Sequence, residues 1–249
     1  MSLTCDGFLG GRLRLTQPAR GYRAGMDAVL LAAACPARPG AAVLELGCGI
    51  GAASLCLGAR VPGLALTGLE LQPDYADLAR QNGAANGIAL EVVTGDLAAL
   101  PRALRARRFD QVLMNPPYFT PGTPAPDAGR ATARHEATPL AVWIDAGLRR
   151  LVPGGGLTLI QRADRLPEVL AALSPRAGAI HLRPLAPRPG ADASRFVLTA
   201  IKGRRDPLRW LAPLVIHDAP AHAGDGADDY APLLRAILRD GAALPMAER

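Results

Sequence analysis

Short apolar runs alternate with longer, helix-like segments between residues 26 and 175 of this 249-residue chain. The run AAVLELG at 41–47 is bounded by glycines and too short for a helix, so it predicts a buried strand. Four similar runs predict strands at 64–70, 89–96, 109–114 and 155–161. Strands that alternate with helices are typical of a mostly parallel sheet with helices on both faces.

The segments between these strands include helices that we predict at 26–35, 52–60, 73–86 and 167–173. Two more strands, 179–187 and 194–203, are joined by a tight PRPG connection and predict an antiparallel hairpin at the sheet edge. The expected fold is α/β, an open, doubly wound, mostly parallel seven-stranded sheet. We expect a single domain over 1–249, with an N-terminal extension (1–25), a catalytic core (26–203) and a C-terminal extension (204–249) that holds a short helix at 229–241.

The segment between the fourth and fifth strands, 119–139, is rich in Pro, Gly, Ala and Thr and has no apolar periodicity. A loop of this length is usually functional or disordered. We expect residues 119–137 to be mobile.

The net charge is +6, and Lys202 is the only lysine. The positive surplus favours an anionic partner such as RNA, although an Arg-rich composition is also typical of a GC-rich genome. The four cysteines form no CxxC pair and no histidine lies at metal spacing, so no metal is predicted. No apolar run reaches ~18 residues and no leader pattern is present, so we expect a cytoplasmic protein without a membrane partner. The oligomeric state is not predicted.

The stretch VLELGCGIG places Gly47, Gly49 and Gly51 between a predicted strand and a predicted helix. Glycines let the backbone turn sharply and approach a ligand, while the helix N-terminus offers free N–H groups. This pattern predicts a nucleotide pocket. With Ala52 it also fits the dinucleotide fingerprint, so a dinucleotide-dependent enzyme or a non-catalytic nucleotide-binding protein stays open at this point.

Two acidic residues follow the next two predicted strands. Glu70 ends the second strand about twenty residues after the glycine turn, where an acid can bind ribose hydroxyls. Asp96 ends the third strand at the same edge of the sheet. A lone acid at a strand end is often a helix cap, but three successive strand ends with a glycine turn, Glu and Asp are better explained by one ligand across their tips.

The fourth strand ends in Asn115-Pro116-Pro117-Tyr118. Two prolines cannot continue a sheet ladder, so the chain leaves the sheet at this point. The strand end therefore presents an amide side chain, two carbonyls and an aromatic ring.

These motifs resemble the class I S-adenosylmethionine-dependent methyltransferases over roughly residues 20–203. The resemblance rests on E-x-G-x-G-x-G from Glu45 to Gly51, on the acids Glu70 and Asp96, and on NPPY at 115–118. It implies S-adenosylmethionine as cofactor. The cofactor-binding residues that it implies are Glu45, Gly47, Gly49, Gly51, Glu70, Leu71, Asp96, Leu97 and Asn115.

In such an enzyme the motif from Asn115 to Tyr118, with Pro116 and Pro117, would be catalytic. The Asn115 side-chain oxygen and the Pro116 carbonyl would accept both N–H groups of an exocyclic amine and localise its lone pair for attack on the methyl group. Tyr118 would stack on the planar substrate and stabilise developing positive charge. No strong base is needed, because the amine can lose its proton after the methyl transfer. Catalysis would therefore rest on positioning and preorganised polarity.

Residues 7–33 resemble the bacterial tRNA adenine-N6 methyltransferases of a valine tRNA. That resemblance implies that Tyr22, Arg23 and Asp27 lie across the cofactor. The alternative for two of them is that Asp27 caps its helix and Arg23 is a solvated charge. We therefore expect N-methylation of an exocyclic amine in RNA, with adenine N6 of a tRNA favoured.

An NPPY enzyme that methylates a glutamine of a translation factor is the alternative, but such enzymes usually carry an N-terminal helical domain for which residues 1–42 leave no room. Residues that could contact RNA lie in the loop and after the last strand. They are Phe119, which could join Tyr118 in stacking, Arg130, Arg134, His135, Arg204, Arg205 and Arg209.

Overall fold

The five predicted parallel strands lie side by side in one sheet in the computed structural model, which describes residues 2–21, 23–118, 138–174, 176–218 and 229–247. They are β3 (Ala42–Leu46), β4 (Ala65–Glu70), β5 (Leu90–Thr94), β6 (Phe109–Met114) and β7 (Leu151–Arg162). Their order across the sheet is β7-β6-β3-β4-β5, and every neighbouring pair is parallel. From β3 the chain first adds β4 and β5 on one side, and then returns to add β6 and β7 on the other side of β3. The winding direction therefore changes between β3 and β6, where open α/β sheets bind ligands beyond the strand carboxyl ends.

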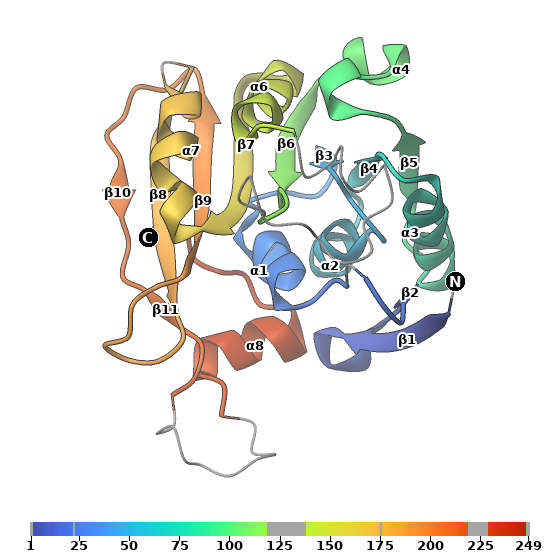
Figure 1. The fold of residues 1–249 in the computed structure, drawn as a ribbon, viewed down its shortest axis with the longest axis horizontal. Coiled ribbons are helices and arrows are strands. Elements are labelled where there is room, and N and C mark those ends of the chain that lie inside the picture. Colours follow the sequence, from blue (N-terminus) through green and yellow to red (C-terminus); the bar gives the residue numbers. More distant parts are fainter. Residues whose placement is uncertain (1, 22, 119–137, 175, 219–228, 248–249) are drawn as a thin grey trace.

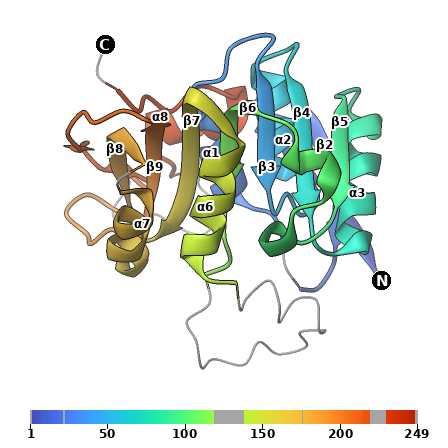
Figure 2. The same cartoon turned by 90° about the horizontal axis from the view of Figure 1, so that it is seen from above.

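Helices cover both faces of this sheet, as predicted. Figure 1 shows α1 (Met26–Ala34) and α2 (Ala52–Arg60) below the central strands and α4 (Arg102–Arg105) and α6 (Leu140–Arg150) above them, with α7 (Leu166–Leu173) to the left of α6. From above, α6 and α7 lie in front of the strands and α8 (Pro232–Asp240) lies behind them (Figure 2). α3 (Pro73–Ala85) packs against β4 and β5. None of the helices in the described ranges is long and apolar enough to span a membrane.

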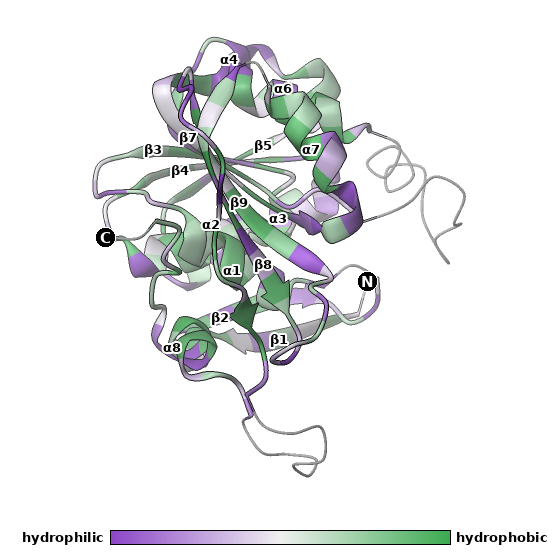
Figure 3. Cartoon of the chain, turned by 90° about the vertical axis from the view of Figure 1, so that its left-hand side faces the viewer, coloured by the Kyte–Doolittle hydropathy of each residue, from purple (hydrophilic) through white to green (hydrophobic). Residues whose placement is uncertain are grey.

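The apolar side chains of each central strand alternate between two hydrophobic layers. In β3, Leu44 and Leu46 pack in the layer that holds Trp143 of α6, whereas Val43 packs in the layer of α1 and α2. Successive side chains of a strand point to opposite faces, and a parallel sheet buries both. This explains why the central strands are continuously apolar in sequence. β9 and α1 are also hydrophobic along most of their length (Figure 3).

The predicted C-terminal hairpin is confirmed as an antiparallel pair of β8 (Ala177–Ala186) and β9 (Arg195–Lys202). β9 inserts between β7 and β8 and runs antiparallel to both. The hairpin is not the outermost part of the sheet, because β10 (Arg209–Trp210) and β11 (Leu214–Val215) pair in parallel with β8. The described sheet therefore has nine strands instead of seven. Strands of two residues are too short to produce a pattern that predicts them.

Some further elements have no counterpart in the prediction, among them helix α6 and the N-terminal strands. Helix α6 buries Leu140, Trp143, Ile144 and Gly147, which lie at helical spacing just after the Pro-rich segment. At the N-terminal end, β1 (Leu3–Phe8) and β2 (Leu13–Pro18) form a separate two-stranded antiparallel sheet beside α8 (Figure 3). Short 3-10 helices complete the described elements at Leu9–Gly11, Leu97–Ala99 and Ala163–Arg165.

Candidate active site

The glycine turn follows β3 directly and leads into α2. Gly47, Gly49 and Gly51 have φ values of 65°, 54° and 82°, the left-handed region that side chains rarely adopt. A Cβ atom on Gly51 would also lie 2.9 Å from a methyl group of Leu90. Glycine is therefore needed in this turn for conformation, and at Gly51 also for space, and the turn lies at the carboxyl edge of the sheet.

Glu70, the last residue of β4, is a buried carboxylate that contacts this turn. Its Oε2 accepts a hydrogen bond from the Gly49 N–H and its Oε1 accepts one from the Gln72 N–H, both at 2.9 Å. No cation pairs with Glu70 within the described residues. Each carboxylate oxygen has a second lone pair, so Glu70 keeps acceptor capacity for two hydroxyl groups of a ligand. Leu71, the next residue, is half-buried beside it.

Asp96 follows β5 at the same edge. Its Oδ1 accepts a hydrogen bond from the Ala98 N–H at 2.8 Å and caps the short helix Leu97–Ala99. Its Oδ2 has no hydrogen-bond partner among the described residues, and the side chain is half-buried. Asp96 can therefore cap the short helix with Oδ1 and still bind a ligand with Oδ2. Leu97 is buried in the hydrophobic layer behind it.

Glu45 points into the protein from β3. Its Oε2 accepts hydrogen bonds from the Ser54 N–H (2.9 Å) and the Ser54 hydroxyl (2.5 Å), so it ties β3 to α2 across the glycine turn. Burial raises the pKa of Glu45 to about 7, and the Ser54 hydrogen bonds only partly oppose that rise. These contacts give Glu45 a role in bracing the turn. Its direct contact with a cofactor stays a prediction.

Asn115 follows the last residue of β6. Met114 pairs with Leu46, so Asn115 lies level with the start of the glycine turn on the neighbouring strand. Its side chain is half-buried and has no hydrogen-bond partner within the part of the chain that the structure describes. An amide that is partly desolvated and unpaired at this edge is an acceptor and donor available to a ligand.

Gln161, at the end of β7, was not predicted as a site residue. It is fully buried, and its side-chain Nε2 donates to the Pro116 carbonyl at 3.2 Å while its Oε1 accepts from the Arg162 N–H at 2.9 Å. It therefore fixes the orientation of the carbonyl that follows Asn115. The sequence signal was a lone polar residue at the end of the apolar run in β7, the strand beside β6.

Tyr118 leaves the sheet and turns toward α1. Its hydroxyl donates to Oδ2 of Asp27 at 2.5 Å, and Asp27 also forms an ion pair with Arg195 at the start of β9. Arg23 instead contacts the N-terminal hairpin, where it donates to the Pro18 carbonyl at 2.7 Å and pairs with Asp6 at 2.8 Å. A cofactor contact of Arg23 and Asp27 stays a prediction, and Tyr22 lies outside the described residues.

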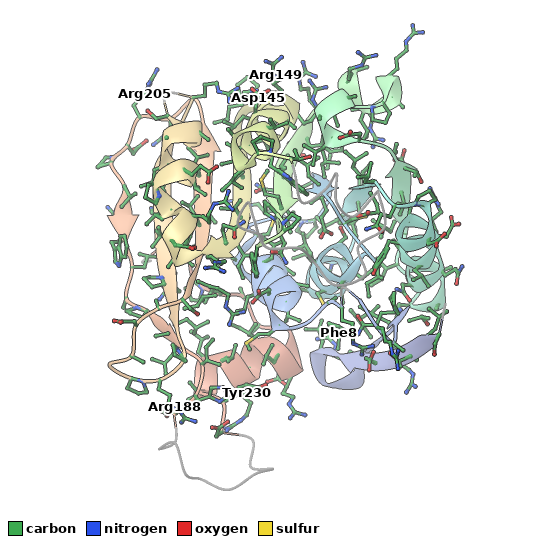
Figure 4. All side chains as sticks on the ribbon, in the orientation of Figure 1. Phe8, Asp145, Arg149, Arg188, Arg205 and Tyr230 are labelled. Atoms are coloured by element: carbon green, nitrogen blue, oxygen red, sulfur yellow. The ribbon has the colours of Figure 1, made fainter. Side chains whose placement is uncertain are left out.

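The substrate residues predicted in the loop, Phe119, Arg130, Arg134 and His135, and the predicted mobility of 119–137 also lie outside the described residues. RNA contact by Arg204, Arg205 and Arg209, which follow the last predicted strand, stays a prediction, and the structure shows where these arginines lie. Because β9 is antiparallel to β7, it ends at the opposite edge, where Lys202 donates to the carbonyl of Leu151, the first residue of β7. Arg204 and Arg205 follow there, and Figure 4 shows Arg205 at the same end of the molecule as Asp145 and Arg149 of α6. Arg209 starts β10, the outer strand beside β8.

A cavity of about 450 Å³ lies between the β1–β2 hairpin, the start of α1 and α8. Phe8, Arg23 and Tyr230 are among its lining residues, and neither the glycine turn nor Asn115 lines it. We place the candidate active site at the sheet edge because glycines, carboxylates and an unpaired amide converge there. Within the described ranges, no group of His, Cys, Asp and Glu side chains could hold a metal ion.

Curated relatives share this chain's sequence over much of its length. A protein named tRNA1(Val) (adenine(37)-N6)-methyltransferase from Porphyromonas gingivalis is 35% identical over 173 residues, which is 66% of this chain and 68% of the relative. A protein of the same name from Dickeya chrysanthemi is 27% identical over 250 residues, 96% of this chain and 95% of the relative.

Solved structures share the fold. The crystal structure of a predicted O-methyltransferase from Agrobacterium tumefaciens matches with a TM-score of 0.70 and 30% identity over 87% of this chain and 97% of that one. TrmN from Thermus thermophilus matches with a TM-score of 0.53 and 24% identity, over 71% of this chain and 48% of that one.

The family model described as the methyltransferase small domain matches residues 25–172, which include the glycine turn, both acids and the NPPY motif. The chain belongs to the methyltransferase small-domain family.

Proposed function

We propose that this methyltransferase transfers a methyl group from S-adenosylmethionine to adenine N6 of a tRNA. The observation that carries the proposal is Asn115, a half-buried amide at the carboxyl edge of the sheet, level with the glycine turn and without a partner in the described residues. The names of the relatives from P. gingivalis and D. chrysanthemi support a tRNA adenine as the substrate.

The residues at the edge fit the cofactor. Gly47, Gly49 and Gly51 lack Cβ atoms and adopt positive φ, which would let the backbone of this turn approach the methionine part closely. Glu70 is buried without a cation in the described part of the chain and keeps lone pairs for ribose hydroxyls, and Asp96 Oδ2 is available to the adenine amino group. When bound, S-adenosylmethionine supplies the methyl group as an electrophile.

The chain's own contribution lies in how it would hold the target amine. The lone pair of an adenine amino group is delocalised into its ring, which makes the nitrogen a poor nucleophile. The Asn115 side-chain oxygen and the Pro116 carbonyl would accept its two N–H bonds and localise the lone pair. Gln161 uses one lone pair of that carbonyl and leaves the other for the substrate. Tyr118 would stack on the base. These are effects of positioning and preorganised polarity.

The test is transfer of labelled methyl groups from S-adenosylmethionine to unmodified bulk tRNA, ribosomal RNA and a peptide-release factor in parallel. Each product is then digested and the methylated unit is identified. N6-methyladenosine in the tRNA fraction alone is the expected result. Label in the release factor as methylglutamine would move the enzyme to a protein substrate, and N2-methylguanosine in ribosomal RNA would retain the chemistry on a different base.

A further inference from the structure

One carboxylate joins three segments that are distant in sequence. Asp27, in the first turn of α1, accepts from the Tyr118 hydroxyl with Oδ2 (2.5 Å) and from the Arg195 guanidinium with Oδ1. The Asp27 side chain is 15% exposed and that of Arg195 is 28% exposed. Asp27 is therefore in direct contact with Tyr118 and is itself held by Arg195.

The surroundings of Arg195 indicate that its place is set by Asp27. Arg195 on β9 lies directly opposite Arg162 on β7, and like charges directly opposite in a sheet are destabilising. Arg162 has a separate acid, Asp164, at 2.8 Å. The second arginine is therefore unfavourable in the strand pair itself, and its ion pair with Asp27 offsets the repulsion.

The same contact removes freedom from the Tyr118 ring. Pro116 and Pro117 fix the backbone φ angles just before it, so the main remaining freedom around Tyr118 is in its own backbone and side-chain rotations. The hydrogen bond to Asp27 holds the far end of the ring, while the half-buried side chain keeps part of its surface accessible. A ring held in one orientation stacks on a substrate with less loss of entropy.

We infer that Asp27, ion-paired with Arg195, is a positioning residue that holds the Tyr118 ring in the orientation in which it stacks on the base to be methylated. The inference rests on the proposed function. It makes Asp27 act through the Tyr118 hydroxyl and not through the cofactor.

The experiment is a double-mutant cycle of Asp27→Ala and Tyr118→Phe, with kcat and KM measured on unmodified tRNA and the affinity for S-adenosylmethionine measured by calorimetry. Each single variant is expected to lower kcat by about 10- to 100-fold, the range for a misplaced reacting group. The kcat of the double variant should lie within about threefold of the kcat of the slower single variant, because both changes break the same contact. The cofactor Kd should stay within about threefold of wild type.

Asp164→Asn is the matched control. It removes a carboxylate from Arg162, the arginine opposite Arg195, but has no link to Tyr118, so kcat should stay within about twofold of wild type. Asp27→Asn is a graded variant outside the cycle: it keeps an oxygen for the Tyr118 hydroxyl and should retain more kcat than Asp27→Ala. Where Asp27→Ala lowers the melting temperature too far, the comparison of Asp27→Asn, which keeps the contact, with Tyr118→Phe, which loses it, tests the inference.

Effects on kcat that multiply in the double variant would overturn the inference, as would a weaker cofactor affinity with unchanged kcat at saturation. A coupling seen only in unfolding free energies, with full kcat in every variant, would leave the contact a purely structural one and also overturn it. Wild-type protein that labels no tRNA would instead overturn the proposed function, and the inference with it.

Discussion

The carboxylate of Glu70 accepts a hydrogen bond from the backbone N–H of Gly49 at 2.9 Å. This bond joins the acid that ends β4 to the middle of the glycine turn after β3. The two features that sequence alone suggests as halves of a nucleotide pocket are therefore one hydrogen-bonded unit. A change at Glu70 should affect both the ribose contact and the turn.

We predict that Glu70→Gln raises the Kd for S-adenosylmethionine by about tenfold or more. Hydrogen bonds to charged groups contribute about 1.5–3 kcal/mol, and 1.4 kcal/mol corresponds to tenfold in affinity. Calorimetric titration measures this directly. Glu91→Gln is the control, since Glu91 is exposed on β5 and pairs with Arg107, and should bind as wild type does. Equal affinity in Glu70→Gln and wild type would refute the ribose role.

Asn115→Ala should abolish most turnover and spare cofactor binding. Removing one preorganised polar group from a reacting centre costs about 10²- to 10³-fold in kcat, and Asn115 makes no hydrogen bond within the described residues that its loss would break. The measurement is single-turnover methylation of tRNA with a parallel cofactor titration. Full methyl transfer by Asn115→Ala would show that the amide takes no part in the reaction.

Gln161→Leu should lower kcat by about tenfold with little change in cofactor Kd. The variant keeps the side chain similar in volume but removes the donor that orients the Pro116 carbonyl at 3.2 Å. Gln161→Glu is the companion variant, because it keeps an acceptor for the Arg162 N–H and still lacks the donor. If Gln161→Glu retains wild-type kcat while Gln161→Leu does not, packing and not carbonyl orientation explains the effect.

The stability of the protein should depend on the protonation of Glu45. Burial raises the pKa of Glu45 to about 7 from 4.5, so the folded state keeps a proton that the unfolded chain releases between those values. The stability that this group contributes is present below about pH 4.5 and is lost as pH rises through 7, by roughly 3 kcal/mol. Denaturant unfolding of wild type and Glu45→Gln from pH 5 to 8 measures it. The unfolding free energy of wild type should fall relative to that of Glu45→Gln as pH rises, and parallel curves would contradict the shift.

A comparison of Gly87 and Gly51, which both have positive φ, distinguishes the cost of backbone strain from the cost of lack of space for a side chain. Gly87 has φ +65° and nothing within 4 Å of an added Cβ, so Gly87→Ala should cost about 1–2 kcal/mol of unfolding free energy from conformation alone. Gly51 has φ +82° and a contact at 2.9 Å with Leu90, so Gly51→Ala should cost more and also weaken cofactor binding. Equal costs for the two variants would show that the turn yields to the added methyl group.

The sequence by itself determined the central strands, the glycine turn and the acids after β4 and β5. These features depend on local rules, namely the length of apolar runs, the need for glycine at positive φ and the convergence of parallel strand ends at one edge. Asn115 to Tyr118 were found for the same reason, since two prolines end a strand wherever it lies. The position of each was therefore predictable from neighbours in the chain.

The tertiary structure alone decided which side chains meet across that edge. Gln161 reaches a carbonyl 45 residues earlier, Tyr118 reaches Asp27 over 91 residues, and Arg195 reaches it over 168. The antiparallel insertion of β9 also carries Arg204 and Arg205 to the opposite edge from Asn115. Such contacts follow from strand order, direction and register, which arise when both faces of the sheet are buried together and which no local pattern encodes.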